Sequence, residues 1–323
     1  MKKVLVVLPI QEKHHSIIEN NIDNCEFRYN NQRNVTEEEL EWADIILGNV
    51  LPPEMLGKYK HFEYIALESA GADAYVKPGV ISGNTVLTNA TGVYSQAVAE
   101  HGLAMTLALM KNLPFYRDKQ SDHDWLSFDK GVIPCSSPIG ATVLVVGLGD
   151  IGLYYAKLIK SLGAYVIGIK RRKTECPEFV DELYTTEEID NIIPRADIIF
   201  SVLPGTKATY HFYDKNLFSK MKKSAIFINC GRGASVDTEA LCEALENKII
   251  FAAGCDVFEN EPLPETDRAW NTRNMFITPH RAGFFDLPGT IEKLCTLSNK
   301  NLKSWLEGKD LINIVDFETG YKK

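Results

Sequence analysis

The sequence has 323 residues, of which 45% are hydrophobic and 24% charged, a composition typical of globular cores in about two domains. The net charge of −8 argues against a nucleic-acid-binding face, and no apolar run is long enough to span a bilayer, so we expect neither nucleic acid nor membrane as partner. None of the seven cysteines has metal-knuckle spacing, so we expect free thiols, no metal and a cytoplasmic location.

The first part of the chain alternates short β-rich runs with helical stretches, which indicates an α/β domain with a parallel sheet. Between the second and third runs, Thr36 and Glu39 have capping-box spacing, so a helix should begin there. The four runs are KVLVVLP (3–9), CEFRY (25–29), DIILGN (44–49) and EYIALE (63–68).

A second α/β series follows an apolar helix expected at 100–110, and a last helix is expected from about Pro288 to Glu307, stopped by Gly308. We therefore predict two Rossmann-like or flavodoxin-like domains, with the cofactor domain inserted into a discontinuous substrate domain and the active site between them. The substrate (catalytic) domain should comprise 1–97 plus 287–323, and the dinucleotide-binding Rossmann domain 98–286. The strands of the second series are expected within 141–152, 164–170, 196–204, 224–231, 249–257 and 275–280.

A GxGxxG turn, Gly147 to Gly152, directly follows a β-run and directly precedes an amphipathic helical stretch. In that context Gly147 allows the tight turn, Gly149 removes a side chain where a pyrophosphate approaches, and Gly152 lets helix and strand pack closely. Asp150 and Ile151 then open the helix whose N–H groups bind the anion. We expect a bound dinucleotide; a glycine-rich turn without a ligand is the alternative.

Four consecutive cations follow the next expected strand, where an acid would accept hydrogen bonds from the ribose 2′-hydroxyl. Lys170 lies 18 residues after Gly152, and Arg171, Arg172 and Lys173 come next. Such cations would pair with a 2′-phosphate. We therefore favour NADP(H) and keep NAD(H) as possible; a solvated strand end is the alternative.

Arg232, Glu261 and His280 each stand at or just after the end of an expected strand, where open parallel sheets bind ligands. Singly, each could be an ordinary ion-pairing, solvated or packed residue. Together they suit a 2-oxo acid: the guanidinium would bind the carboxylate and keto oxygen, His280 would donate a proton, and Glu261 would raise the pKa of His280.

The chain resembles the D-isomer-specific 2-hydroxyacid dehydrogenase family over nearly its whole length. The resemblance implies an oxidoreductase that transfers a hydride between a nicotinamide cofactor and a small 2-oxo acid or D-2-hydroxy acid, glyoxylate/hydroxypyruvate-type reduction being favoured, and a homodimer. A phosphoglycerate dehydrogenase-like enzyme and an NAD(H)-sensing corepressor are the alternatives. The segments that carry the resemblance are ALESAGADAYV (66–76), TNATGVYSQAVAEHGLAMTLALMKN (88–112), VLVVGLGDIG, LPGTKATYH (203–211), NCGRGASVD, CDVFENEPLP and ITPHRAG.

The resemblance also implies roles for single residues: Asp256 would bond the nicotinamide carboxamide, and the N–H groups of Ser69, Ala70 and Gly71 the substrate carboxylate. Three residues depart from the family pattern: Thr91 replaces a proline, which should loosen its loop, Arg281 replaces an apolar residue, and Lys170 replaces the acid. His101 is expected to be a packed histidine at the domain junction. The cofactor pocket would be completed by Leu203, Pro204, Cys230, Gly231, Arg232, His280, Ala282 and Gly283.

Overall fold

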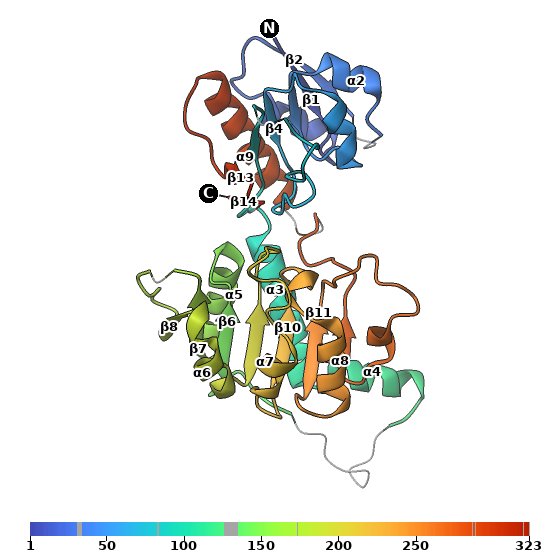
Figure 1. The fold of residues 1–323 in the computed structure, drawn as a ribbon, viewed down its shortest axis with the longest axis vertical. Coiled ribbons are helices and arrows are strands. Elements are labelled where there is room, and N and C mark those ends of the chain that lie inside the picture. The colour runs from blue at the N-terminus through green and yellow to red at the C-terminus, as the bar shows by residue number, and fades with distance from the viewer. Residues whose placement is uncertain are drawn as a thin grey trace. The chain divides into compact units, whose positions relative to one another are not determined.

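The structure is a computed structural model that describes residues 1–30, 34–82, 84–125, 135–172, 174–285, 287, 289–318 and 320–322. The chain divides into two compact units, which we call unit 1 (residues 1–94 and 285–323) and unit 2 (residues 95–284) (Figure 1). Each unit is built on its own parallel sheet, which confirms the predicted fold class.

Unit 1 contains a five-stranded parallel sheet in the order β2-β1-β3-β4-β5, the flavodoxin-like order. The strands are β1 (Lys2–Val6), β2 (Cys25–Tyr29), β3 (Ile45–Leu47), β4 (Tyr64–Ala66) and β5 (Val86–Thr88). The helices are η1 (Glu12–His14), α1 (His15–Ile18), α2 (Glu37–Trp42), η2 (Pro53–Lys58) and α9 (Thr290–Leu306), and the tail forms a hairpin of β13 (Val315–Asp316) and β14 (Tyr321–Lys322).

The apolar runs of the sequence become the buried centre of this sheet, because β1, β3 and β4 are covered on both faces. Helix α2 begins at the predicted capping box: the Thr36 hydroxyl accepts from Glu39 N at 3.2 Å, and Glu39 Oε2 accepts from Thr36 N at 2.8 Å. Helix α9 packs on the sheet through Trp305, which stacks on Tyr64 with ring centroids 6.0 Å apart. It ends just before Gly308, as predicted, whose φ is +65°.

Unit 2 contains a seven-stranded parallel sheet in the order β12-β11-β10-β9-β6-β7-β8. Its first strand therefore lies between the second and the fourth, and the chain direction across the sheet reverses at that point. In such sheets ligands bind beyond the carboxyl ends of the strands at the reversal. The strands are β6 (Thr142–Val146), β7 (Tyr165–Lys170), β8 (Glu182–Thr185), β9 (Ile198–Ser201), β10 (Ile226–Asn229), β11 (Ala252–Cys255) and β12 (Met275–Ile277).

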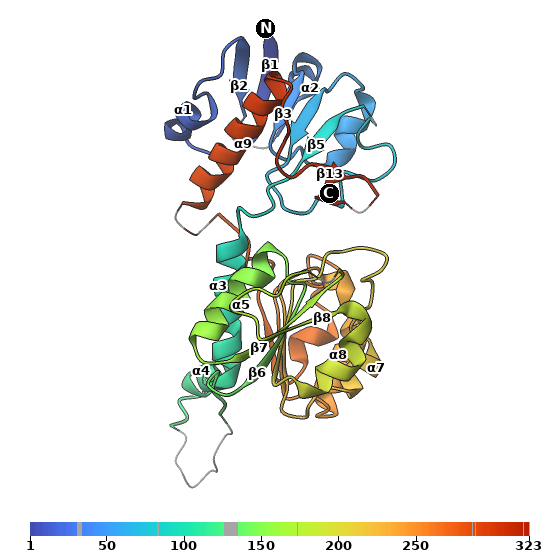
Figure 2. The same ribbon diagram turned by 90° about the vertical axis from the view of Figure 1, so that its left-hand side faces the viewer.

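Helices cover both faces of the unit 2 sheet, α3 and α5 on one face and α7 and α8 on the other (Figure 2). Close packing under α3 requires Gly102, where a Cβ would lie 2.3 Å from the Phe200 ring. The helices are α3 (Ser95–Met110), α4 (Leu113–Ser121), α5 (Asp150–Ser161), η4 (Thr186–Glu188), α6 (Ile189–Ile192), η5 (Ile193–Arg195), α7 (Lys215–Ser219), η6 (Gly233–Ser235), α8 (Thr238–Glu246) and η7 (Arg268–Asn271). Across the described ranges, no helix has both the length and the apolar character that a membrane span needs.

Candidate active site

The glycine-rich turn joins β6 to α5 and is shaped by two close backbone approaches. Gly147 has a φ of +97°, and a Cβ there would lie 2.8 Å from the carbonyl oxygen of the residue after β9. A Cβ on Gly152 would lie 2.3 Å from the carbonyl oxygen of Gly147, whereas a Cβ on Gly149 would meet open space. Helix α5 starts at Asp150, which is exposed, and Ile151, which is partly buried. The turn therefore leaves room for a pyrophosphate at a helix N-terminus.

The predicted cations follow the neighbouring strand, where Lys170 ends β7. The backbone N–H groups of Gly147 and Leu148 both donate to the carbonyl oxygen of Ile169 at 3.1 Å, so the glycine turn and the end of β7 are adjacent. Arg171 and Arg172 are exposed and Lys170 is partly buried. None of these three side chains has an ion pair or hydrogen bond with any residue that the structure describes. Lys173 lies outside the described residues.

The loops that follow β9 and β10 lie against each other beside the glycine turn. Leu203 is buried and Pro204 is partly buried, and a Cβ on Gly231 would lie 2.6 Å from the carbonyl oxygen of Leu203. Burial raises the pKa of the Cys230 thiol well above its ordinary value. The thiol is therefore neutral, and Cys230 is unsuited to act as a nucleophile.

His280 and Glu261 form a hydrogen-bonded pair, with Nδ1 of His280 2.6 Å from Oε2 of Glu261. The other carboxylate oxygen accepts from the backbone N–H of Phe258 at 2.8 Å, which fixes its orientation. The His280 side chain is 51% exposed, and its Nε2 has no hydrogen-bond partner in the described part of the chain. The ring therefore presents one nitrogen for proton transfer while the other is held.

The electrostatics of the pair favour a protonated histidine. The hydrogen bond and the charge of Glu261 raise the pKa of His280, although partial burial and the positive charge of Arg232 act against this. Burial alone would raise the pKa of Glu261, but the hydrogen bonds from His280 and the backbone, together with the Arg232 charge, hold that pKa below its ordinary value. The structure thus brings the three predicted catalytic residues into one electrostatic cluster.

Arg232 stands on the loop between β10 and η6, and this loop packs tightly against the loop that carries Glu261. A Cβ on Gly233 would lie 1.9 Å from the carbonyl carbon of Phe258, so only glycine permits this approach. The carbonyl oxygen of Arg232 accepts a hydrogen bond from the Ser235 hydroxyl at 2.7 Å. The backbone that presents the guanidinium is therefore fixed relative to the carboxylate of the pair.

Buried Asp256 organises the segment that carries His280. Its Oδ1 accepts from the Thr278 hydroxyl at 2.6 Å and from Arg281 N at 2.9 Å, and its Oδ2 accepts from Ala282 N at 3.0 Å. Its carbonyl oxygen accepts from His280 N at 2.8 Å. These bonds hold the segment in which His280 has a φ of +51°, a left-handed conformation that is uncommon for residues other than glycine.

His101 on α3 extends this network. The sequence predicted only that His101 would be a packed histidine, without this hydrogen bond. Its Nε2 lies 3.0 Å from the Thr278 hydroxyl oxygen and 3.6 Å from Oδ1 of Asp256. Because that hydroxyl donates to Asp256, it accepts from Nε2–H of His101. The two partners are 177 residues apart in the chain, and a threonine after a strand carries no pattern that would indicate the contact. Gly283, at the end of the segment, is partly buried.

The loop Ser69-Ala70-Gly71 follows β4 in unit 1, whereas the other predicted site residues belong to unit 2. Its carbonyl oxygens are all bonded, that of Ser69 by Ala90 N at 2.9 Å, that of Ala70 by the Asn89 amide at 2.7 Å and that of Gly71 by the Ser69 hydroxyl at 2.7 Å. Its three backbone N–H groups donate to no described residue. Consecutive N–H groups of this kind suit an anion such as a carboxylate.

Comparison with known proteins decides the family. The model of the family described as "D-isomer specific 2-hydroxyacid dehydrogenase, NAD binding domain" matches residues 103–282. A glyoxylate reductase of Thermofilum pendens is 31% identical over 278 residues, which are 82% of this chain and 78% of that protein. The chain belongs to the D-isomer-specific 2-hydroxyacid dehydrogenase family. The resemblance drawn from the sequence is thereby confirmed, and the chain is an NAD(P)-dependent oxidoreductase.

Solved structures share the fold of this dehydrogenase along its whole length. A D-isomer specific 2-hydroxyacid dehydrogenase family protein from Aeromonas salmonicida has a TM-score of 0.86 and 26% identity, covering 98% of this chain and 99% of that one. An NADPH-dependent glyoxylate/hydroxypyruvate reductase from Sinorhizobium meliloti, in complex with NADP and malonate, has a TM-score of 0.76 and 25% identity, covering 100% and 98%.

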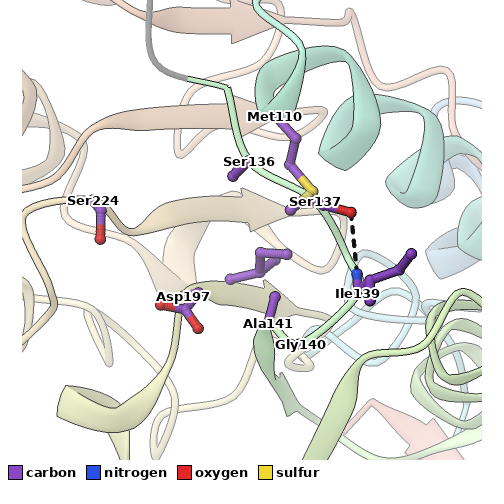
Figure 3. Close-up of a pocket in the computed structure, with 9 residues that line it drawn as sticks. Met110, Ser136, Ser137, Ile139, Gly140, Ala141, Asp197 and Ser224 are labelled. Carbon is purple, nitrogen blue, oxygen red and sulfur yellow. Dashed lines mark hydrogen bonds between the residues drawn. The ribbon is translucent and has the colours of Figure 1, made fainter.

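A hollow of about 250 Å³ lies at the amino ends of the unit 2 strands (Figure 3). Its lining residues precede or begin β6, β9 and β10, whereas the glycine turn and the cluster of Arg232, Glu261 and His280 follow strand ends. None of the predicted site residues lines it. The lining residues are Met110, Ser136, Ser137, Ile139, Gly140, Ala141, Asp197, Ile198 and Ser224.

Proposed function

We propose that this dehydrogenase reduces a small 2-oxo acid of the glyoxylate or hydroxypyruvate type to the D-2-hydroxy acid. The observation that carries the proposal is the His280–Glu261 pair, whose raised pKa at His280 supplies a proton donor beside the guanidinium of Arg232. The names of the Thermofilum and Sinorhizobium relatives, a glyoxylate reductase and a glyoxylate/hydroxypyruvate reductase, support this substrate class.

The proposed chemistry divides between cofactor and protein. When bound, the reduced nicotinamide supplies a hydride to the keto carbon. Arg232 holds the carboxylate and keto oxygen of the substrate, and protonated His280 delivers a proton from Nε2 to that oxygen as it becomes a hydroxyl. Glu261 keeps Nδ1 protonated and the ring oriented, while the N–H groups of Ser69–Gly71 bind the substrate carboxylate.

We infer that NADP(H) is the preferred cofactor, with NAD(H) also accepted. The open space at Gly149 fits a pyrophosphate. The next strand ends at Lys170, Arg171 and Arg172 follow it, and none of the three has an acidic partner among the described residues. A 2′-phosphate would give these cations a partner. The Sinorhizobium reductase, which was solved with NADP, supports the same preference. Asp256 keeps a role beside the nicotinamide, since each carboxylate oxygen accepts more than one bond.

We propose further that unit 2 is the cofactor domain, that unit 1 is the substrate domain and contributes the loop of Ser69–Gly71, and that the enzyme is a cytoplasmic homodimer. Large apolar side chains are exposed on and just after α4, which is unusual unless another surface covers them. They are Leu113 (54% exposed), Phe115 (38%), Tyr116 (42%) and Trp125 (95%). The seven free cysteines suit a reducing compartment.

The decisive experiment combines the purified enzyme with NADPH or NADH and a panel of 2-oxo acids, and follows the loss of nicotinamide absorbance. We expect turnover of glyoxylate and hydroxypyruvate, faster with NADPH. His280→Ala should lose nearly all turnover while its Kd for NADPH stays within about twofold, because the imidazole handles only the proton. Faster turnover of 3-phosphohydroxypyruvate would instead support a phosphoglycerate dehydrogenase-like enzyme. Cofactor binding without any turnover would refute the reductase proposal and favour a cofactor-sensing protein.

A further inference from the structure

The C-terminal segment of the chain runs beside the loop that is proposed to bind the substrate carboxylate. We infer that Asn313, in this segment, is a positioning residue that acts through Asn89 to set the backbone of Ser69–Gly71. The inference rests on the proposed function of that loop. All of the residues involved belong to unit 1.

Asn313 is itself held in place by helix α9. The Asn301 side chain, which is 1% exposed, donates to the carbonyl oxygen of Ile312 at 2.9 Å and accepts from Ile312 N at 2.8 Å. Asn313 follows at a φ of +59°, a left-handed conformation that asparagine tolerates better than most residues. The helix therefore delivers the Asn313 amide at a fixed point.

Asn313 makes hydrogen bonds with Asn89 and Thr91, the two ends of a three-residue stretch in the loop that follows β5. Its side-chain amide donates to the carbonyl oxygen of Thr91 at 2.8 Å and to that of Asn89 at 3.3 Å. Its own carbonyl oxygen accepts from Asn89 N at 3.2 Å. Three hydrogen bonds thus tie this stretch to the C-terminal segment.

Asn89 passes this restraint on to the carboxylate loop. Its buried side chain donates to the carbonyl oxygen of Ala70 at 2.7 Å and accepts from both N and Oγ1 of Thr91, at 3.2 and 2.8 Å. Thr91, which stands in place of a proline, makes both of the latter bonds, and the expected loosening of its loop stays a prediction. Proline has neither of the donors that Thr91 uses here, so it could not make these bonds.

The tail also sets where the stretch of N–H donors ends. Gly320, at a φ of +71°, accepts through its carbonyl oxygen from Ala72 N at 3.2 Å. The N–H groups of Ser69, Ala70 and Gly71 donate to no described residue, while the next N–H along is occupied by the tail. The C-terminal segment thus holds the donor loop at two points, through Asn89 and at Ala72.

The test removes the amide without disturbing the backbone. Asn313→Gly keeps the left-handed conformation and loses both side-chain bonds. We expect a KM for the 2-oxo acid about tenfold higher, with kcat and the KM for NADPH within about twofold, since ground-state carboxylate binding is what is lost. The control is Asn299→Ala, because Asn299 also donates to two backbone carbonyls of unit 1, those of Ile18 and Asn20 at 2.8 and 2.9 Å, away from the loop. The control should stay within twofold of wild type in all three constants.

A second readout requires no substrate. Hydrogen exchange at Asn89 and Ala90, whose N–H groups are bonded in this network, should accelerate at least fivefold in Asn313→Gly and remain unchanged in Asn299→Ala. Unchanged exchange, or accelerated exchange with an unchanged KM, would overturn the positioning role. A wild-type enzyme that reduces no 2-oxo acid would refute the proposed function instead, and the exchange result would then decide the inference alone.

Discussion

The cofactor preference makes the sharpest prediction, because it depends on two exposed side chains. Replacing Arg171 and Arg172 with alanine should reduce kcat/KM for NADPH by about ten- to a hundredfold and leave that for NADH within about threefold. Two hydrogen bonds from the arginines to a 2′-phosphate, if fully shielded from solvent, would contribute about 3–6 kcal/mol to NADPH binding. Both arginines are exposed, so solvent screening lowers this to about 1.4–2.8 kcal/mol, which is a ten- to hundredfold change.

The assay is steady-state reduction of one 2-oxo acid with each cofactor, repeated from about 0.05 to about 0.5 M salt, over which the wild-type preference should shrink. The matched control is Lys223→Ala with Arg273→Ala, which removes the same charge from exposed positions before β10 and β12. That pair should leave the cofactor preference unchanged. A wild type that favours NADH, or equal weakening of both cofactors in the arginine double variant, would show that the cations are only a solvated strand end.

Three further substitutions test the site. Glu261→Gln should lower the pKa of His280, because the carboxylate raises it. The kcat/KM for reduction should therefore fall off at a lower pH than in wild type. A pH profile that does not move would exclude this role of Glu261. Gly152→Ala should destabilise the enzyme by about 1–3 kcal/mol in thermal unfolding, because its Cβ would lie 2.3 Å from a backbone oxygen; unchanged melting would contradict that geometry. Arg232→Lys should lower kcat/KM for the 2-oxo acid at least about tenfold with NADPH binding retained, since an ammonium cannot make the planar two-pronged contact; full activity would exclude that contact.

Most strands of the two parallel sheets were predicted from the sequence, and the two that were missed lack a distinct hydrophobic run. CEFRY matches β2 residue for residue, and the apolar runs around β6, β7 and β9 each contain a strand. Strands β5 and β8 were not predicted. The first has only three residues, and the second, ELYT, lies at the sheet edge with every residue only partly buried, so neither has a distinct hydrophobic run.

The candidate site could be predicted only where the signal is local in the sequence. Their positions after expected strands were enough to predict that Arg232, Glu261 and His280 would lie close together, because the carboxyl ends of parallel strands lie on the same side of the sheet. The residues that bond the His280 segment and the loop after β5 were not predictable, since Thr278 and Asn313 bond distant parts of the chain and carry no local pattern. Which residues hold His280 or the loop of Ser69–Gly71 in place depends on tertiary packing.

The interruption of unit 1 by unit 2 imposes an order on folding during synthesis. Every element of the seven-stranded sheet lies between residues 95 and 284, so unit 2 is complete before α9 is made. Trp305 stacks on Tyr64 of β4, and Asn299 donates to the carbonyl oxygen of Ile18 of α1 at 2.8 Å. These two elements therefore complete their packing only after α9 has been synthesised. Such long-range contacts form late. In the nascent chain Tyr64 and Ile18 therefore lack their α9 partners until all of unit 2 has been synthesised, so unit 1 is the half that stays incomplete for longer.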